Sequence, residues 1–235
     1  MILQKKQFKF RHEYKYLLHP SDYYRLREAL KKVMQMDKHS GTNQGYHIRS
    51  LYFDDIYDTS LAEKLLGDLK RAKYRIRIYD YSDQIIKLEI KEKYGDYIQK
   101  KSFSISRSEY EKILDGDVTF LHGTNNNVKE RFYYEYRNNV LRPKVIVDYF
   151  REAFILPFNQ IRITFDKDLS AARPQRNIFS RELYSKQVGQ DYAIIMEVKY
   201  NNFLPGYIRD VLEIQDVTRL AVSKYVICRE YIARG

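Results

Sequence analysis

The chain has 235 residues, of which 44% are hydrophobic and 31% are charged, so it is long enough for one substantial core and is not disordered. A formal net charge of +11 and a pI near 9.4 favour an anionic partner. The single cysteine, Cys228, excludes a disulfide framework and a Cys-based zinc site. Neither a signal peptide nor a run of about 18 apolar residues is visible, so we expect a cytoplasmic protein with no transmembrane segment.

Alternating and helical patterns predict the first elements of the chain. Residues 8–18 alternate charged with aromatic side chains, which predicts a strand with one polar face. Pro20 and the helical spacing of the apolar residues after it predict a helix that fades near Lys38. A second strand is expected over residues 46–54, followed by a short helix around 60–69.

The segment 73–93, KYRIRIYDYSDQIIKLEIKEK, predicts an antiparallel hairpin with a turn at 81–84. Both arms alternate strictly, so each has one apolar face and one charged face. The charged face contains Lys73, Arg75, Arg77, Lys87, Glu89, Lys91 and Lys93. Like charges that face each other on a sheet are unfavourable, so this face requires a polyanion or thorough solvation.

The same patterns continue through the rest of the chain. Ser106 and Glu109 form a capping-box signature that begins a short helix, and Pro143 ends a longer helix over 125–141. Further strands are expected over 97–105, 144–154, 161–166 and 193–200, a loop with a small hairpin over 173–190, and helices near 207–214 and 217–232.

No linker, internal repeat or low-complexity tract divides the chain, so we predict one domain over residues 1–235. Its class is α+β, with about eight strands and peripheral helices. Charged side chains recur at alternate positions in about six of these strands. An open sheet would present them as a solvated surface, whereas closure into a barrel would place them in a polar lumen.

A lumen lined by about ten cations and a few carboxylates suits an oligophosphate, whose oxygens bind Arg and Lys well. The carboxylates would hold a divalent cation, and the site would position an in-line phosphoryl transfer. The sequence has no Walker A motif, dinucleotide-binding glycine pattern or nucleophile elbow. Tyrosines among basic residues also allow a nucleic-acid interpretation, but most lie opposite the cations, so no nucleic-acid partner is expected.

A series of short motifs runs in order from residue 11 to residue 225. They are Arg11-x-Glu13-x-Lys15-Tyr16, Ser50-Leu51-Tyr52-Phe53-Asp54, Tyr74-Arg75-Ile76-Arg77, Lys87-x-Glu89-x-Lys91, Lys100, Tyr149-x-Arg151-x-Ala153-Phe154, Arg162-x-Thr164-x-Asp166, Glu197-Val198-Lys199 and Ser223-Lys224-Tyr225. In this order the chain resembles the VTC domain, the polyphosphate polymerase domain of the CYTH-like triphosphate tunnel metalloenzyme superfamily. The resemblance is greatest to its stand-alone bacterial members.

The resemblance implies a closed antiparallel β-barrel, or tunnel, of about eight strands, in agreement with the alternation. It also implies a polymerase that transfers the terminal phosphoryl group of ATP, or of another nucleoside triphosphate, to inorganic polyphosphate with Mn²⁺ or Mg²⁺. A triphosphatase and a non-catalytic polyphosphate-binding module remain alternatives. A membrane-associated partner protein also remains open, since eukaryotic polymerases of this family work within membrane complexes.

The resemblance assigns roles to individual positions. The catalytic residues would be Lys15, Arg75, Arg77, Lys87, Lys91, Arg151, Arg162 and Lys199. The other phosphate-binding residues would be Arg11, Arg49, Lys100, Tyr149, Ser223 and Lys224. Glu197 would be the principal metal ligand, with Glu13 and Glu89 as helpers. Arg11 stands where the wider superfamily has the first Glu of a Glu-x-Glu-x-Lys strand, which favours chain binding over two-metal hydrolysis.

Overall fold

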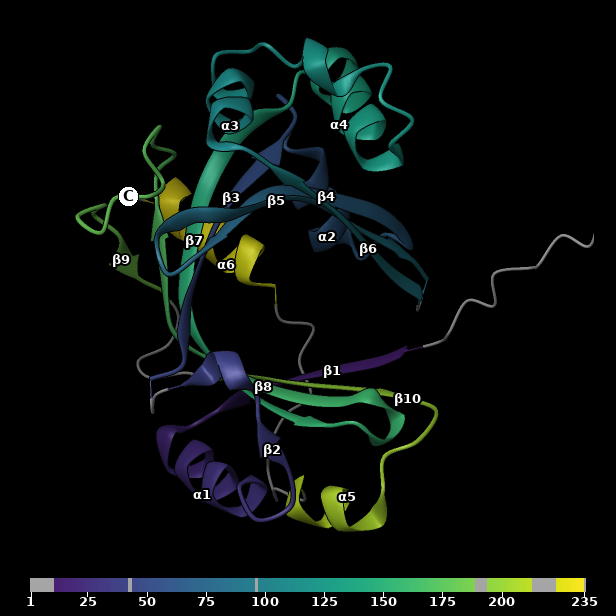
Figure 1. The fold of residues 1–235 in the computed structure, drawn as a ribbon, viewed down its shortest axis with the longest axis vertical. Helices are drawn as coiled ribbons and strands as arrows, with labels where there is room; N and C mark the ends of the chain where they lie inside the picture. Colours follow the sequence, from purple (N-terminus) through teal and green to yellow (C-terminus); the bar gives the residue numbers. More distant parts are fainter. Residues whose placement is uncertain (1–10, 42–43, 96, 189–193, 213–222, 235) are drawn as a thin grey trace, which may run out of the picture.

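A large antiparallel sheet dominates the computed structural model, which describes residues 11–41, 44–95, 97–188, 194–212 and 223–234 (Figure 1). The strand order is β1-β10-β8-β7-β3-β4-β5-β6. These strands are β1 (Arg11–Leu18), β3 (Tyr46–Asp54), β4 (Lys70–Tyr79), β5 (Ser82–Tyr94), β6 (Tyr97–Ile105), β7 (Arg142–Leu156), β8 (Ile161–Ala172) and β10 (Ile194–Asn201). Two short strands are added beside this path, β2 (Gln35–Met36) on β7 and β9 (Lys186–Gln187) on β8.

The predicted closure of this sheet into a barrel is not confirmed. Among the described residues, β1 pairs with β10 alone and β6 with β5 alone, so the sheet has two edges. Strand pairing requires a separation of about 4.8 Å, whereas two extended side chains bridge a wider gap. The two halves of the sheet meet through such side chains, since Lys91 Nζ on β5 lies 3.1 Å from Glu13 Oε1 on β1. The result is a curled sheet with an open side (Figure 1).

The predicted hairpin is confirmed, with its charged face intact. The register of β4 and β5 places Lys73 opposite Lys91 and Arg75 opposite Glu89. The turn is tighter than expected, because Asp80 and Tyr81 have φ of 48° and 61° and connect the strands alone. A two-residue turn of this kind matches the twist of the flanking strands, so β5 begins already at Ser82.

The helices follow the predicted positions closely. They are α1 (Pro20–Leu30), α2 (Thr59–Leu66), α3 (Arg107–Leu114), α4 (Asn127–Asn138), α5 (Gly206–Leu212) and α6 (Lys224–Arg234). The capping box of α3 is present, because Ser106 and Glu109 each accept from the backbone N–H of the other. The helix expected over 217–232 is confirmed from Lys224 onward, and its part over 217–222 lies outside the described residues. Within the described residues, no helix is long and apolar enough to cross a membrane.

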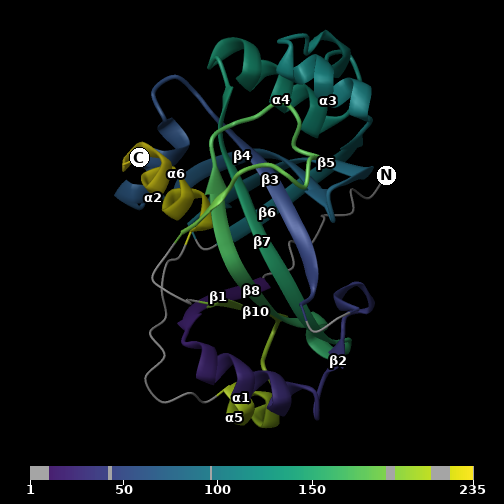
Figure 2. The ribbon, with the colours of Figure 1, turned by 90° about the vertical axis from the view of Figure 1, so that its left-hand side faces the viewer.

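The outer, apolar face of the sheet is covered by helices on both halves (Figures 1 and 2). On one half, α3 and α4 bury Ile113 and Phe132 against Ile76 of β4 and Leu88 of β5. On the other half, α1 and α5 pack against β8 and β10, where Leu26, Ile163, Val198 and Ile208 share a second core. Burial of these side chains stabilises the fold and leaves the opposite, charged face turned inward.

The last helix, α6, packs on the inner face of the sheet rather than the outer face. Tyr225 and Cys228 of α6 are buried with Val147 of β7 and Leu169 of β8. Ser223, which precedes α6, and Lys224, its first residue, line the cavity left on this inner face. The motif Ser223-Lys224-Tyr225 therefore opens the helix instead of lying in its middle, and α6 bounds one part of the cavity.

Candidate functional site

The inner face of the curled sheet encloses a cavity of about 630 Å³. Of its described lining residues, ten are cationic and two are carboxylates. The cations are Lys15, Lys73, Arg75, Arg77, Lys91, Lys100, Arg151, Arg162, Lys199 and Lys224. The carboxylates are Glu13 and Glu197. Tyr149 and Ser223 also line the cavity, so all of these residues except Lys73 were among the predicted site residues. These residues come from β1, β4, β5, β6, β7, β8, β10 and the start of α6. The fold therefore brings side chains from most of the sheet to one cavity.

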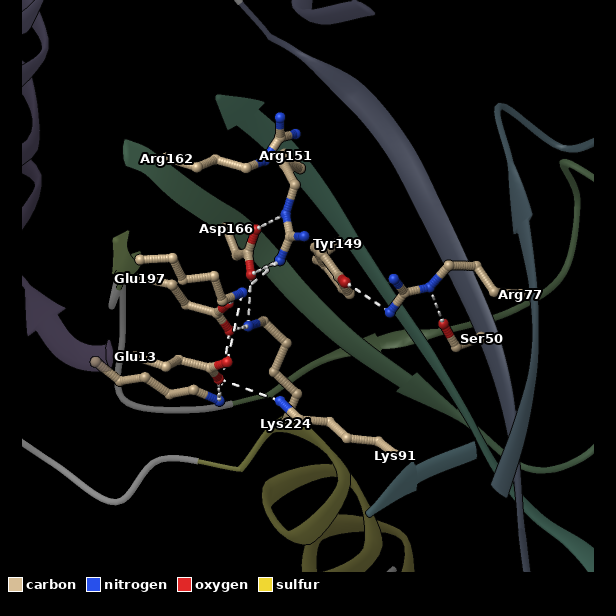
Figure 3. A network of polar contacts seen from close by, with 12 residues as sticks. Glu13, Ser50, Arg77, Lys91, Tyr149, Arg151, Arg162, Asp166, Glu197 and Lys224 are labelled. Carbon is tan, nitrogen blue, oxygen red and sulfur yellow. Dashed lines mark hydrogen bonds and ion pairs between the residues drawn. The ribbon is translucent and has the colours of Figure 1, made fainter. Parts of the chain in front are cut away.

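Glu197 and Asp166 are two buried carboxylates that lie among several cationic side chains (Figure 3). Asp166 Oδ1 and Oδ2 accept from Arg151 Nε and Nη2, both at 2.6 Å, and Oδ2 lies 2.5 Å from Lys224 Nζ. Lys224 also donates to Glu197 Oε1 at 3.1 Å, and Lys199 donates to Glu197 Oε2 at 2.5 Å. Burial alone would raise the pKa of Glu197, but the ammonium groups of Lys224, then Lys15, hold it well below its usual value. Both carboxylates are therefore ionised at neutral pH.

Glu13 on β1 forms a second carboxylate beside the first. Its oxygens lie 3.1 Å from Lys91 Nζ, 3.6 Å from Lys15 Nζ and 3.9 Å from Lys199 Nζ. Burial opposes ionisation, yet the ammonium groups of Lys91 and Lys199 lower the pKa of Glu13 to about 2. Lys15 and Lys199 each contact Glu197 as well, so the two carboxylates share a pair of cations.

The two arginines of β4 are held by Glu89 from the neighbouring strand. Arg75 contacts Glu89 Oε2 at 2.6 Å, and Lys100 donates to Oε1 at 2.9 Å. Arg77 lies 3.8 Å from the same carboxylate and donates to Tyr149 Oη at 3.2 Å. Burial would raise the pKa of Glu89, but Arg75 and Arg77 lower it far below its usual value. Glu89 therefore positions the two guanidinium groups at the wall of the cavity, which both arginines line.

Arg162 and Asp166 lie on the same strand but form ion pairs with other residues. Arg162 Nη1 instead donates to Asp37 Oδ2 at 2.6 Å, and Nη2 donates to Tyr46 Oη at 3.3 Å. Asp166 pairs with Arg151, its neighbour across β7 and β8. Both arginines line the same cavity, so the exchange of partners leaves their predicted role unaffected.

Several lysines of the cavity lose proton affinity in this crowded setting. Burial lowers the pKa of Lys91 to about 8, although Glu13 opposes the shift. Burial likewise lowers the pKa of Lys199, and it lowers the pKa of Lys73 strongly, with repulsion from Lys15 adding to the effect. The internal carboxylates thus leave the cationic charge incompletely balanced, and an anion in the cavity would relieve the repulsion.

Gly45 fixes the approach of β3 to the site. It has φ of 79°, and a Cβ at this position would lie 2.2 Å from the backbone oxygen of Arg151. Only glycine combines this backbone conformation with so close a contact. Any side chain here would displace β7 at the residue that carries the central guanidinium.

Four of the predicted site residues are not seen at the cavity. Arg49 is buried on the opposite face of β3, where it pairs with Asp148 at 2.7 Å. Lys87 lies beyond the cavity and donates to Ser104 Oγ at 2.6 Å. Glu89 lies behind Arg75 and does not line the cavity. The side chain of Arg11 is outside the described part of the chain.

Other cavity residues were not among the predicted site residues. Lys73, Tyr46 and Tyr52 line the cavity, and Asp166 holds Arg151 from behind. For Lys73 the signal was available, because it alternates with Arg75 on the charged face of the hairpin. The two tyrosines could have been found from the register of β3 with β4, which a single sequence does not supply.

The acidic residues fit a divalent metal ion that is shared with a bound ligand. No group of three or more His, Cys, Asp or Glu residues suited to a metal exists among the described residues, so a cage made by protein alone is not formed there. Glu13 and Glu197 nevertheless offer ionised oxygens at the cavity wall. Mg²⁺ is commonly held by one or two carboxylates together with substrate phosphates, and this donor set meets that requirement.

A comparison with protein families identifies the chain. The VTC domain pattern matches residues 10–233, which is nearly the whole sequence. The chain belongs to the VTC domain family. Membership indicates a triphosphate-tunnel domain, with phosphoryl-transfer chemistry that depends on a divalent metal.

Other comparisons are more distant. No curated protein sequence matches this VTC domain significantly. A solved structure from Bacillus halodurans, described as a "putative adenylate cyclase", shares 13% identity, covers 88% of this chain and 86% of its own, and has a TM-score of 0.48. A conserved hypothetical protein from Pyrococcus furiosus shares 10% identity, covers 90% and 97%, and has a TM-score of 0.45. These likenesses are too low to bear on activity.

Proposed function

We propose that this VTC domain is a metal-dependent polyphosphate polymerase that transfers the terminal phosphoryl group of ATP to a polyphosphate chain. The observation that carries the proposal is the convergence of ten cations on one cavity that also presents two ionised carboxylates. Arg forks and Lys ammonium groups match phosphate oxygens, and one cavity holds enough of them for several phosphates.

The reaction requires little covalent chemistry from the protein. A terminal oxygen of the polyphosphate chain forms a bond to the γ-phosphorus of ATP, and the bond to the β–γ bridging oxygen breaks, which releases ADP. Arg75, Arg77 and Arg151 would hold the three phosphate groups involved and neutralise the charge that spreads over the transferring group. Glu89 and Asp166 keep these guanidinium groups in place through the contacts described above.

Glu197, with Glu13 beside it, would hold the divalent ion. Such an ion would supply further neutralisation of the charge on the transferring phosphoryl group. Lys199 and Lys224 already contact Glu197, so these lysines would move onto phosphate oxygens when the carboxylate takes a metal.

The same cavity would also serve a triphosphatase, in which water replaces the chain as acceptor, or a module that only binds polyphosphate. The decisive experiment incubates the purified protein with ATP and Mn²⁺ and follows polyphosphate, ADP and orthophosphate together. Polyphosphate accumulating with ADP is the expected result. Orthophosphate without polyphosphate would replace the proposal by hydrolysis, and neither product with tight polyphosphate binding would reduce it to a binding module.

A further inference from the structure

Lys73 differs from every other described cation of the cavity in its partners. It lies on β4, two residues before Arg75, and its Nζ donates to Ser223 Oγ at 2.7 Å. The same ammonium group lies 5.0 Å from the centre of the Tyr225 ring. Each other cationic lining residue has a carboxylate oxygen within 4.0 Å, but Lys73 has none among the described residues.

The charged side chains that act most strongly on Lys73, among the described residues, are cationic. Lys91 lies opposite it on β5, Lys15 approaches from β1, and Lys64 of α2 and Arg71 of β4 complete the set. Burial and the repulsion from these four side chains lower the pKa of Lys73 well below its usual value. A hydroxyl group and an aromatic ring soften this repulsion but supply no negative charge.

We propose that Lys73 and Ser223 form a phosphate subsite that holds a non-reacting phosphate of the substrate without the help of a metal ion. The ligand class rests on the proposed function, whereas the subsite itself rests on the contacts of Lys73. The cavity is then divided in two. Phosphates near Glu13 and Glu197 would meet the carboxylates that bind the metal, and phosphates near Lys73 would meet an ammonium group that has no carboxylate partner among the described residues.

The cations continue outward from this subsite. Lys64, Arg71 and Lys93 have no ion-pair partner among the described residues, and Arg71 lies opposite Lys93 across β4 and β5. Their mutual repulsion is part of what lowers the pKa of Lys64, after burial. A chain longer than a triphosphate would neutralise this row in turn, so the Lys73 subsite marks the direction in which a bound chain extends.

The test measures binding in the presence of EDTA, so that no metal and no turnover contribute. Tripolyphosphate and a long-chain polyphosphate are titrated calorimetrically into the wild-type protein and into Lys73→Met, Lys73→Arg and Ser223→Ala. Loss of a charge-assisted hydrogen bond should weaken the binding of both probes at least about tenfold in Lys73→Met. Lys73→Arg should restore most of the affinity, and Ser223→Ala should weaken binding less than Lys73→Met.

The matched control is Lys32→Met, which removes the same charge from an exposed position after α1. It should bind both probes like the wild type. Lys73→Met should melt at the same or a higher temperature than the wild type, because it removes a repelled charge. Wild-type affinity in Lys73→Met, or no binding by the wild type in EDTA, would overturn the subsite. If the wild type forms neither polyphosphate nor orthophosphate from ATP while Lys73→Met still loses affinity, the polymerase proposal fails and the subsite stands.

Discussion

Strand β7 contributes to two cross-strand Arg–Asp pairs that look alike in the sequence but have different roles. On its outer face, Asp148 accepts from Arg49 of β3 at 2.7 and 2.8 Å. Arg49 also donates to the backbone oxygens of Ile178 and Ser180, so loop residues cover it. On its inner face, Arg151 makes the same bidentate contact with Asp166 of β8, but there the pair borders the cavity.

The number of cations around each carboxylate distinguishes the two pairs. Asp148 has one close guanidinium, and burial raises its pKa. Burial acts on Asp166 too, but Arg151 and Lys224 together lower its pKa. The outer pair is thus neutral in sum and sealed by the protein. Around Asp166 the positive charge exceeds the negative charge, so the inner group is suited to binding an anionic ligand.

The largest effect on stability is expected from breaking the outer pair. Arg49→Met leaves Asp148 buried without its partner and should lower the free energy of unfolding by about 3–5 kcal/mol. Urea unfolding measures this loss. The double variant Arg49→Met, Asp148→Leu should recover much of it, because it removes the orphaned charge. A single variant as stable as the wild type would show that the pair has no structural role.

Arg151→Met should act on function more than on stability. We expect product formation from ATP to fall about 10²–10³-fold, since a preorganised donor to the transferring group is lost. The loss of stability should be smaller than in Arg49→Met, because Asp166 keeps Lys224 at 2.5 Å. Steady-state assays and urea unfolding of both variants give the comparison. Equal activity in Arg151→Met and the wild type would remove Arg151 from the active site.

Glu197→Gln should separate the metal from the phosphate contacts. The substitution keeps the shape of the side chain and removes its charge, so the apparent affinity for Mn²⁺ should fall about 10–100-fold, by analogy with the loss of groups around metal sites. Binding of polyphosphate in EDTA should persist or increase, since the three lysines that contact Glu197, namely Lys15, Lys199 and Lys224, are released. Metal titration of turnover measures the first effect, and an unchanged metal dependence would exclude Glu197 as a ligand.

The pH dependence of stability offers a probe of the outer face. His47 stacks on Tyr81 and lies 3.7 Å from Asp148, and burial, then Arg49, lowers its pKa to about 3. In the unfolded chain His47 binds a proton near pH 6.5, whereas in the folded protein it binds one only near pH 3. The free energy of unfolding should therefore fall as the pH drops from 6.5 to 3. The slope from this residue is at most about 1.4 kcal/mol per pH unit. His47→Phe should flatten it, and an unchanged thermal profile would contradict the assignment.

The smallest effect is expected from Lys87→Met. Its ammonium group contacts Ser104 outside the cavity, so activity and stability should both stay within about twofold and 0.5 kcal/mol of the wild type. Arg75→Met, on the adjacent strand, changes a residue of the same charged face that does line the cavity. Comparing the activities of the two variants tests whether a residue must line the cavity to contribute to function. A large loss in Lys87→Met would mean that the site extends farther along β5.

Alternation in the sequence correctly predicted most strands and the shared charged face of β4 and β5, because a period of two is local and depends on geometry alone. Alternation did not predict what surrounds an individual residue of a strand face. Lys87 shares its face with Arg77 but lies past the cavity, and Arg49 faces outward while its neighbours Ile48 and Ser50 face inward. The loop that covers Arg49 comes from about 130 residues later, beyond any local pattern.

Most of the residues that the resemblance assigned to the site line the cavity, but the motifs did not predict the partners of these residues. Arg162 is held by Asp37, which follows β2 and is distant in the sequence. Alternation also could not predict whether the sheet closes into a barrel. It determines which way side chains point, but not the distance between the two edge strands.

The open side of the sheet has a consequence for how a polymer would enter. A sealed tube admits a chain only end first, whereas a split ring admits it from the side. Within the described residues, the edges β1 and β6 are not joined by a backbone ladder, and Lys91 and Glu13 join β5 to β1 through their side chains. The ring can widen without breaking main-chain hydrogen bonds between its edges, so a strand of phosphates could be laid into the groove at its middle and lifted out again.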